Sequence, residues 1–240
     1  MKAIIPVKDS STRVPNKNFK EFYKGLSLFD LTVSKLLKLL NPEDIYMSCE
    51  NPDKKALANK WDIQFIQRDP ILADNDTPFH KVFNGICDQV EGDDDIAWCQ
   101  VIDPMFDSYG ECFNLWNNGD PETKPLKENH DSLVVIYPHK DYYLNDNYKP
   151  MGFGFGPWHT KSQLLPNTYQ LTFTLSILTR ESIKKIGYHV GQYPYWYHAY
   201  NPRVDIDTDK DFEVAKALYA HLSSDLENRR KWSGDSPCCI

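Results

Sequence analysis

Long hydrophobic runs are missing from this sequence. The longest, residues 133–137 and 171–178, fall far short of the ~20 apolar residues that a helix needs to cross a bilayer. Basic side chains are in the minority, with 27 Lys and Arg against 34 Asp and Glu. This balance argues against a broad phosphate-binding face for DNA or RNA, so any anion site must be local. We therefore expect a soluble, cytoplasmic protein that binds neither a membrane nor a nucleic acid.

Glycine and cysteine are also scarce. The 11 glycines form no Walker phosphate loop and no GxGxxG, so P-loop and dinucleotide-binding folds fit poorly. The six cysteines include no CxxC pair and the seven histidines no HxH or HExxH, which argues against a disulfide scaffold and a zinc site. The chain does have 41% hydrophobic residues over 240 positions, enough for a sizeable core in one domain or two small ones.

Short apolar segments typical of strands alternate with segments of helical periodicity along most of the chain. Strands are predicted at 3–7, 45–48, 63–66, 96–102, 133–137 and 172–178, and helices at 28–40, 52–61, from 78, 108–116 and 180–186. The alternation predicts an α/β fold with a mostly parallel, Rossmann-like sheet and helices on both faces. A last strand through 204–207 and a closing helix from Thr208 complete the prediction, and the polar chain from Ser223 onward is expected to fray.

Residues 139–170 break this rhythm with many Tyr, Phe, Trp, Gly, Asn and Pro, which suits a projecting hairpin. We therefore divide the chain into a main domain, 1–138 with 171–225, an inserted arm, 139–170, and a flexible tail, 226–240. Aromatic side chains of the arm could stack on a base or a sugar ring. We favour their packing in a dimer interface, where such residues are enriched.

A polar loop with three cations follows the first predicted strand. In an α/β sheet, ligands bind at the carboxyl ends of the strands, and Lys8, Arg13 and Lys17 would neutralise a triphosphate there. On composition alone, an ordinary basic surface loop is about equally good an interpretation.

Four aspartates stand before and within the start of the predicted closing helix. Side chains two apart in a strand share a face, so Asp205 and Asp207 would present paired carboxylates, a geometry for Mg²⁺. The alternative is that all four cap the positive end of the helix. We favour capping for Asp209 and Asp211, and metal binding for Asp205 and Asp207.

These two stretches together resemble the sugar-acid cytidylyltransferases, the CMP-acylneuraminate synthetase family. Residues 5–18 follow its IPxxxxSxRxPxKN pattern, and residues 205–212 follow its DIDTxxDF pattern. Between them, 68–70 with 72–77 is similar to RP…LAxDxT, 100–104 stands where the family has QPTSP, and 161–166 resembles RQxxP. The resemblance implies a nucleotidyltransferase fold and a Mg²⁺-dependent transfer of CMP from CTP to an anionic sugar acid.

The resemblance also implies roles for individual residues. CTP would be contacted by Lys8, Ser11, Lys17, Asn18, Arg68 and Thr77. The sugar acid would face Gln100, Gln163 and Lys161, with Lys161 standing in for an arginine. Asp205 and Asp207 would hold Mg²⁺, and Lys17 and Arg13 would stabilise the charge on the phosphates. No general base is evident in the sequence; Asp103, which stands where the family has a serine, is a candidate for it.

The family dimerises through an arm at this position, so a homodimer is expected. Differences from the family pattern at Asp9, Thr12 and Ser162 leave two alternatives open. One is a nucleotidyltransferase for a phosphonate, a phosphate or a neutral sugar. The other is a nucleotide-binding protein without turnover.

Overall fold

A mixed sheet forms the centre of the protein, whose computed structural model describes residues 1–10 and 13–233. In this described part the sheet has seven strands: β5 (Gln64–Gln67), β4 (Ile45–Cys49), β1 (Lys2–Pro6), β6 (Ile96–Cys99), β8 (Thr168–Leu178), β7 (Ser132–His139) and β9 (Pro194–His198), in that spatial order. Only β8 runs antiparallel to its neighbours, β6 and β7. The predicted mostly parallel α/β sheet is confirmed.

Helices cover both faces of this sheet. Buried residues of α1 (Leu28–Leu36), α2 (Lys55–Lys60), α4 (Tyr109–Asn118) and α6 (Asp209–Ser233) share one apolar cluster. Those of α3 (Phe79–Cys87) and α5 (Arg180–Ile186) belong to a second cluster. Strand β1 separates the two, because Ala3 and Ile5 belong to the first cluster and Ile4 to the second, as the period of two in a strand requires.

Local hydrogen bonds fix where the helices begin. At α1, Ser27 and Asp30 form a capping box, each side chain accepting from the other residue's backbone N–H. At α6, a second capping box is present: Asp211 N–H donates to Thr208 Oγ1, and Thr208 N–H donates to Asp211 Oδ2. A short hairpin before α1, β2 (Glu21–Tyr23) with β3 (Leu26–Ser27), was not predicted.

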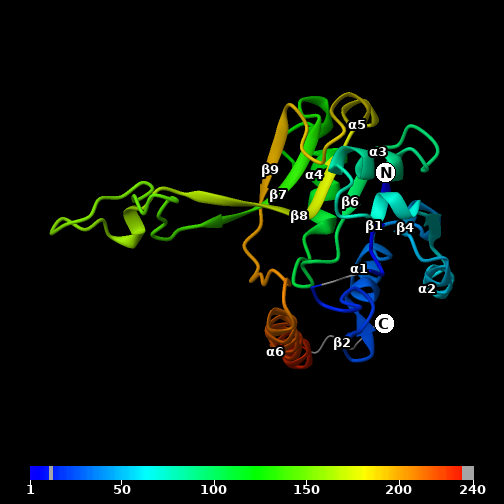
Figure 1. Cartoon of the computed structure of the whole chain (residues 1–240), viewed down its shortest axis with the longest axis horizontal. Coiled ribbons are helices and arrows are strands. Elements are labelled where there is room, and N and C mark those ends of the chain that lie inside the picture. The colour runs from blue at the N-terminus through cyan, green and yellow to red at the C-terminus, as the bar shows by residue number, and fades with distance from the viewer. Residues whose placement is uncertain (11–12, 234–240) are drawn as a thin grey trace.

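The arm leaves the sheet as an extension of β7 and β8. These strands stay paired as far as His139 and Thr168, and the chain between them projects away from the rest of the molecule (Figure 1). The projecting hairpin is therefore confirmed. Many of its large apolar side chains are exposed, and Trp158 is 94% exposed.

Two predictions about the end of the chain were wrong. Residues 204–207 form no strand; the last strand is instead β9, whose Tyr and Trp residues favour extended structure and pair in parallel with β7. The chain also does not fray at Ser223, since α6 continues to Ser233 through residues with good helix propensity. The rest of the predicted tail, 234–240, lies outside the described residues. No helix in the described part is long and apolar enough to cross a membrane.

Candidate active site

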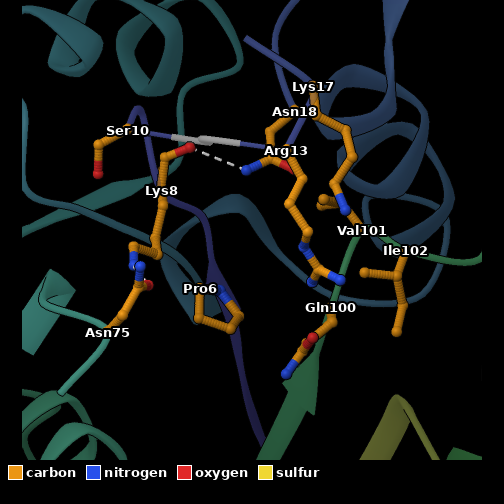
Figure 2. Close-up of a pocket in the computed structure, with 10 residues that line it drawn as sticks. All are labelled: Pro6, Lys8, Ser10, Arg13, Lys17, Asn18, Asn75, Gln100, Val101 and Ile102. Carbon is orange, nitrogen blue, oxygen red and sulfur yellow. Dashed lines mark hydrogen bonds between the residues drawn. The ribbon is translucent and has the colours of Figure 1, made fainter. Parts of the chain in front are cut away.

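A pocket lies at the carboxyl ends of β1 and β6 (Figure 2). Four of the predicted residues from the loop after β1 line it: Lys8, Arg13, Lys17 and Asn18. The chain after β6 contributes Gln100, also predicted. Pro6, Ser10, Asn75, Val101 and Ile102 complete the lining among the described residues. The structure thus gathers residues that are up to 96 positions apart in sequence (from Pro6 to Ile102) at the sheet edge where α/β proteins bind ligands.

Hydrogen bonds hold Lys8 and Asn18 in place. Asn18, only 8% exposed, donates from Nδ2 to the carbonyl of Lys8 at 2.9 Å, which closes the loop on itself (Figure 2). Lys8 Nζ donates to Asn75 Oδ1 at 2.9 Å. Sequence reasoning missed Asn75 and selected Thr77 from the same segment. Thr77 donates its hydroxyl proton to the Ile71 carbonyl and does not line the pocket, so its contact with CTP stays a prediction.

Lys17 and Arg13 face the segment that precedes α6. Lys17 Nζ donates to the Ile206 carbonyl at 2.7 Å. Burial lowers the pKa of Lys17, while the nearby carboxylates of Asp207 and Asp205 oppose this shift. Arg13 Nη1 lies 2.7 Å from Asp207 Oδ1. The two ends of the chain therefore meet in one cluster of cations and carboxylates.

Asp205 and Asp207 flank the buried Ile206, and their side chains are 53% and 48% exposed. The described residues contain no group of three His, Cys, Asp or Glu side chains that could hold a metal ion by itself. Two accessible carboxylates nevertheless fit Mg²⁺, because this ion commonly takes one or two carboxylates and completes its shell with substrate phosphates and water. Asp205 and Asp207 supply these two carboxylates although residues 204–207 do not form a regular strand.

Arg68 is buried, with 2% of its surface exposed, and does not line the pocket. Its Nη2 donates to the carbonyls of Val7 and Ser48, at 2.8 and 2.6 Å. These bonds tie the carboxyl ends of β1 and β4 together. Arg68 therefore supports the loop after β1, and its predicted contact with cytidine stays a prediction.

Asp103 is buried beside the pocket and does not line it. Its Oδ2 accepts the Tyr137 hydroxyl proton and lies 3.9 Å from Arg203 Nε. Burial raises the pKa of Asp103, an effect that the Tyr137 hydrogen bond and the Arg203 charge oppose. The Asp103 side chain is thus enclosed by the protein, and its role as a general base stays a prediction.

Lys161 and Gln163 lie on the arm, away from the pocket of their own chain. Both are exposed, beside and within a short 3₁₀ turn (Ser162–Leu164). Gln163 accepts from Lys140 Nζ through its backbone carbonyl at 3.0 Å. Ser11, the remaining predicted ligand of CTP, lies outside the described residues.

Comparisons with known proteins show the fold of the chain. No protein-family model and no curated protein matches the sequence. Among solved structures, a CMP:2-keto-3-deoxy-manno-octonic acid synthetase complexed with CTP is similar, with a TM-score of 0.61 and 12% identity over 92% of this chain and 99% of that one.

Two further structures share this fold. The 4-diphosphocytidyl-2C-methyl-D-erythritol synthase from Anaerococcus prevotii has a TM-score of 0.58 and 12% identity, over 91% of this chain and 95% of that one. HddC from Yersinia pseudotuberculosis has a TM-score of 0.56 and 10% identity, over 91% and 99%. At these identities the similarity establishes a common fold.

Proposed function

We propose that this protein is a Mg²⁺-dependent cytidylyltransferase, which joins CTP to an anionic sugar acid of the 2-keto type and releases pyrophosphate. The observation that carries the proposal is the pocket itself, where Lys8, Arg13 and Lys17 converge beside Asp205 and Asp207. Cations of this kind bind a triphosphate, and paired carboxylates suit the ion that accompanies it. The fold shared with a synthetase bound to CTP supports the same assignment.

In this reaction the acceptor hydroxyl attacks the α-phosphorus of CTP, and pyrophosphate leaves. Lys17 and Arg13 stabilise the negative charge that grows on the phosphate oxygens and on the leaving group. Asp205 and Asp207 would hold Mg²⁺, which, when bound, supplies a Lewis acid for the phosphate oxygens. Lys8, restrained by Asn75, adds a third fixed cation.

The arm supports the second part of this proposal, a homodimer. Lys161 and Gln163, which would contact the sugar acid, cannot line the pocket of their own chain while the arm projects from it (Figure 1). A second copy could bring them to it and at the same time cover exposed aromatic side chains such as Tyr148, Phe155 and Trp158.

The dimer predicts a defined mass in solution. We expect light scattering at micromolar protein concentration to give about twice the 27.9 kDa of one chain. Removing residues 141–166 and joining the two strands by a short turn should give a monomer that still binds CTP and fails to transfer CMP. A full-length monomer with full activity would contradict both the dimer and the shared site.

Pyrophosphate release tests the function directly. With CTP, Mg²⁺ and a panel of acceptors, we expect release with 2-keto sugar acids and little with matched neutral sugars, since the acceptor carboxylate requires a fixed cation. GTP and ATP serve as controls for the base. If pyrophosphate is released with phosphonates, phosphates or neutral sugars and not with 2-keto sugar acids, the proposed acceptor class is wrong. If no acceptor leads to release, the proposed transferase activity is wrong.

A further inference from the structure

Glu50 makes contacts with the pocket loop that the sequence analysis did not anticipate. It directly follows β4, and its Oε1 accepts three hydrogen bonds from the start of the loop. The donors are Asp9 N–H at 2.8 Å, Ser10 N–H at 3.1 Å and Ser10 Oγ–H at 3.1 Å. A single carboxylate oxygen thus binds two consecutive backbone N–H groups and a side chain of the pocket lining.

The residues after Glu50 hold the same part of the loop. Asn51 Nδ2 donates to Asp9 Oδ2 at 2.7 Å, and Lys54 Nζ lies 2.9 Å from Asp9 Oδ1. Consequently both the backbone and the side chain of Asp9 are attached to the segment between β4 and α2. Burial works against ionisation of Glu50, but hydrogen bonds from Ser10 and Asp9 and the charge of Arg68 keep its pKa below the ordinary value.

These contacts change how a triphosphate can be held. Consecutive backbone N–H groups after a strand commonly form a cradle for phosphate, usually with glycines that allow the required turn. The loop from Lys8 to Asn18 contains no glycine, and its N–H groups at Asp9 and Ser10 point to Glu50 instead. Phosphate binding then depends on side chains, whose directions follow from the shape of the loop.

We propose that Glu50 is a positioning residue for the nucleotide: it fixes the start of the loop so that Lys8 and Ser10 stay in the lining of the pocket. This proposal rests on the proposed function, since it assumes that the pocket takes CTP. The proposal predicts the direction in which removal of Glu50 changes the affinity for CTP. By charge alone, a carboxylate near the pocket repels a triphosphate, so its removal would strengthen binding. If Glu50 acts by positioning, its removal weakens binding.

The experiment is calorimetric titration of CTP with Mg²⁺ into the full-length protein and three variants. Glu50→Ala removes all three accepted bonds, and we expect the Kd for CTP to rise about tenfold or more. Glu50→Gln keeps an oxygen acceptor without the charge, and we expect a rise of about threefold. Asp53→Asn is the control, because it removes the same charge from an exposed side chain in the next turn and should change the Kd by less than about twofold.

Acceptor kinetics give a second measurement. We expect the KM for CTP to rise in both Glu50 variants while the KM for the acceptor stays within about twofold, whereas general loosening of the fold would move both. Thermal unfolding of each variant identifies one that does not fold, and Glu50→Gln, which has the same size and shape, then provides the test.

The outcomes separate this proposal from the function on which it rests. If the wild-type protein binds CTP and the Glu50 variants bind it equally tightly or more tightly, the positioning role is overturned and the proposed function stands. If the wild-type protein binds no CTP, the proposed function is overturned, and the role of Glu50 is overturned with it.

Discussion

Replacing Asp207 with Asn is expected to reduce CMP transfer by about 100-fold or more while the fold remains intact. The change keeps the size of the side chain and removes one of the two charges that would hold Mg²⁺. It also removes the partner of Arg13, whose Nη1 lies 2.7 Å from Asp207 Oδ1. Since the carboxylate is 48% exposed, its loss leaves no buried group without a partner, and stability should change little.

A neighbouring aspartate supplies the control for this variant. Asp209 lies two residues further on, pairs with Lys20 at 3.1 Å and is 71% exposed. Asp209→Asn should therefore retain nearly full turnover, because an exposed ion pair at a helix start contributes little. Steady-state rates at several Mg²⁺ concentrations distinguish the two sites, and only Asp207→Asn should require more Mg²⁺. Equal losses in both variants would favour a helix-capping role for all of these aspartates.

Asp205→Asn is expected to reduce CMP transfer as strongly as Asp207→Asn, although the contacts that it removes are different. Asp205 Oδ2 lies 3.4 Å from Arg203 Nη2, so its partner belongs to its own segment. Both carboxylates raise the pKa of Lys17, so both lie near its ammonium group. A large loss at Asp207 with none at Asp205 would point to the Arg13 pair as the important contact.

The order of strands and helices could be predicted because local patterns determine most of it. Apolar runs such as 3–7 and 133–137 are buried in a mostly parallel sheet that has helices on both faces, and their composition indicates this. β9 was missed because its aromatic residues resembled those of the arm, and only pairing with β7 shows that they belong to the sheet. The segment 204–207 has the alternation of a strand, with Ile206 buried between two accessible aspartates, but no neighbour to pair with.

The site could be predicted in part, through the resemblance of the two ends of the chain to one family. That resemblance brought Lys17 and Asp207 together across 190 residues, and the structure places them in one charged cluster. Glu50 and Asn75 could not be predicted, because nothing in their local sequence distinguishes them from ordinary surface residues. Their importance comes from tertiary contacts with the loop after β1, which a sequence pattern does not record.

Asp103 shows a further limit, because its place in the sheet could be predicted from the sequence and its surroundings could not. It follows β6 closely, at the edge of the sheet where α/β proteins bind ligands, which is the basis for the hypothesis of a catalytic carboxylate. The side chain turns instead into a buried group with Tyr137 and Arg203. Sequence position determines which end of the strand a residue occupies, whereas the packing of β7 and of the chain before α6 determines which way it faces.

Lys17→Ala is expected to weaken the binding of CTP by about tenfold to 100-fold and to slow transfer as well. The ammonium is half-buried and its pKa is lowered by burial, so its charge is screened less by water than that of an exposed lysine. Lys17 also donates to the Ile206 carbonyl, so its loss releases the backbone between the two aspartates. Both effects act in the same direction.

Lys20→Ala is the matched control for Lys17. Lys20 lies one turn further along the same loop, but its Nζ pairs with Asp209 and lies 4.0 Å from the centre of the Phe212 ring. It does not line the pocket. Lys20→Ala removes the same charge as Lys17→Ala. Because salt screens this more distant charge, the Kd for CTP should change by less than about threefold at physiological salt. Calorimetric titration of CTP into both variants makes the comparison. Equal Kd values for Lys17→Ala and the wild-type protein would mean that the loop after β1 is an ordinary basic surface loop, because a phosphate held there cannot lose the charge of Lys17 without a change in affinity.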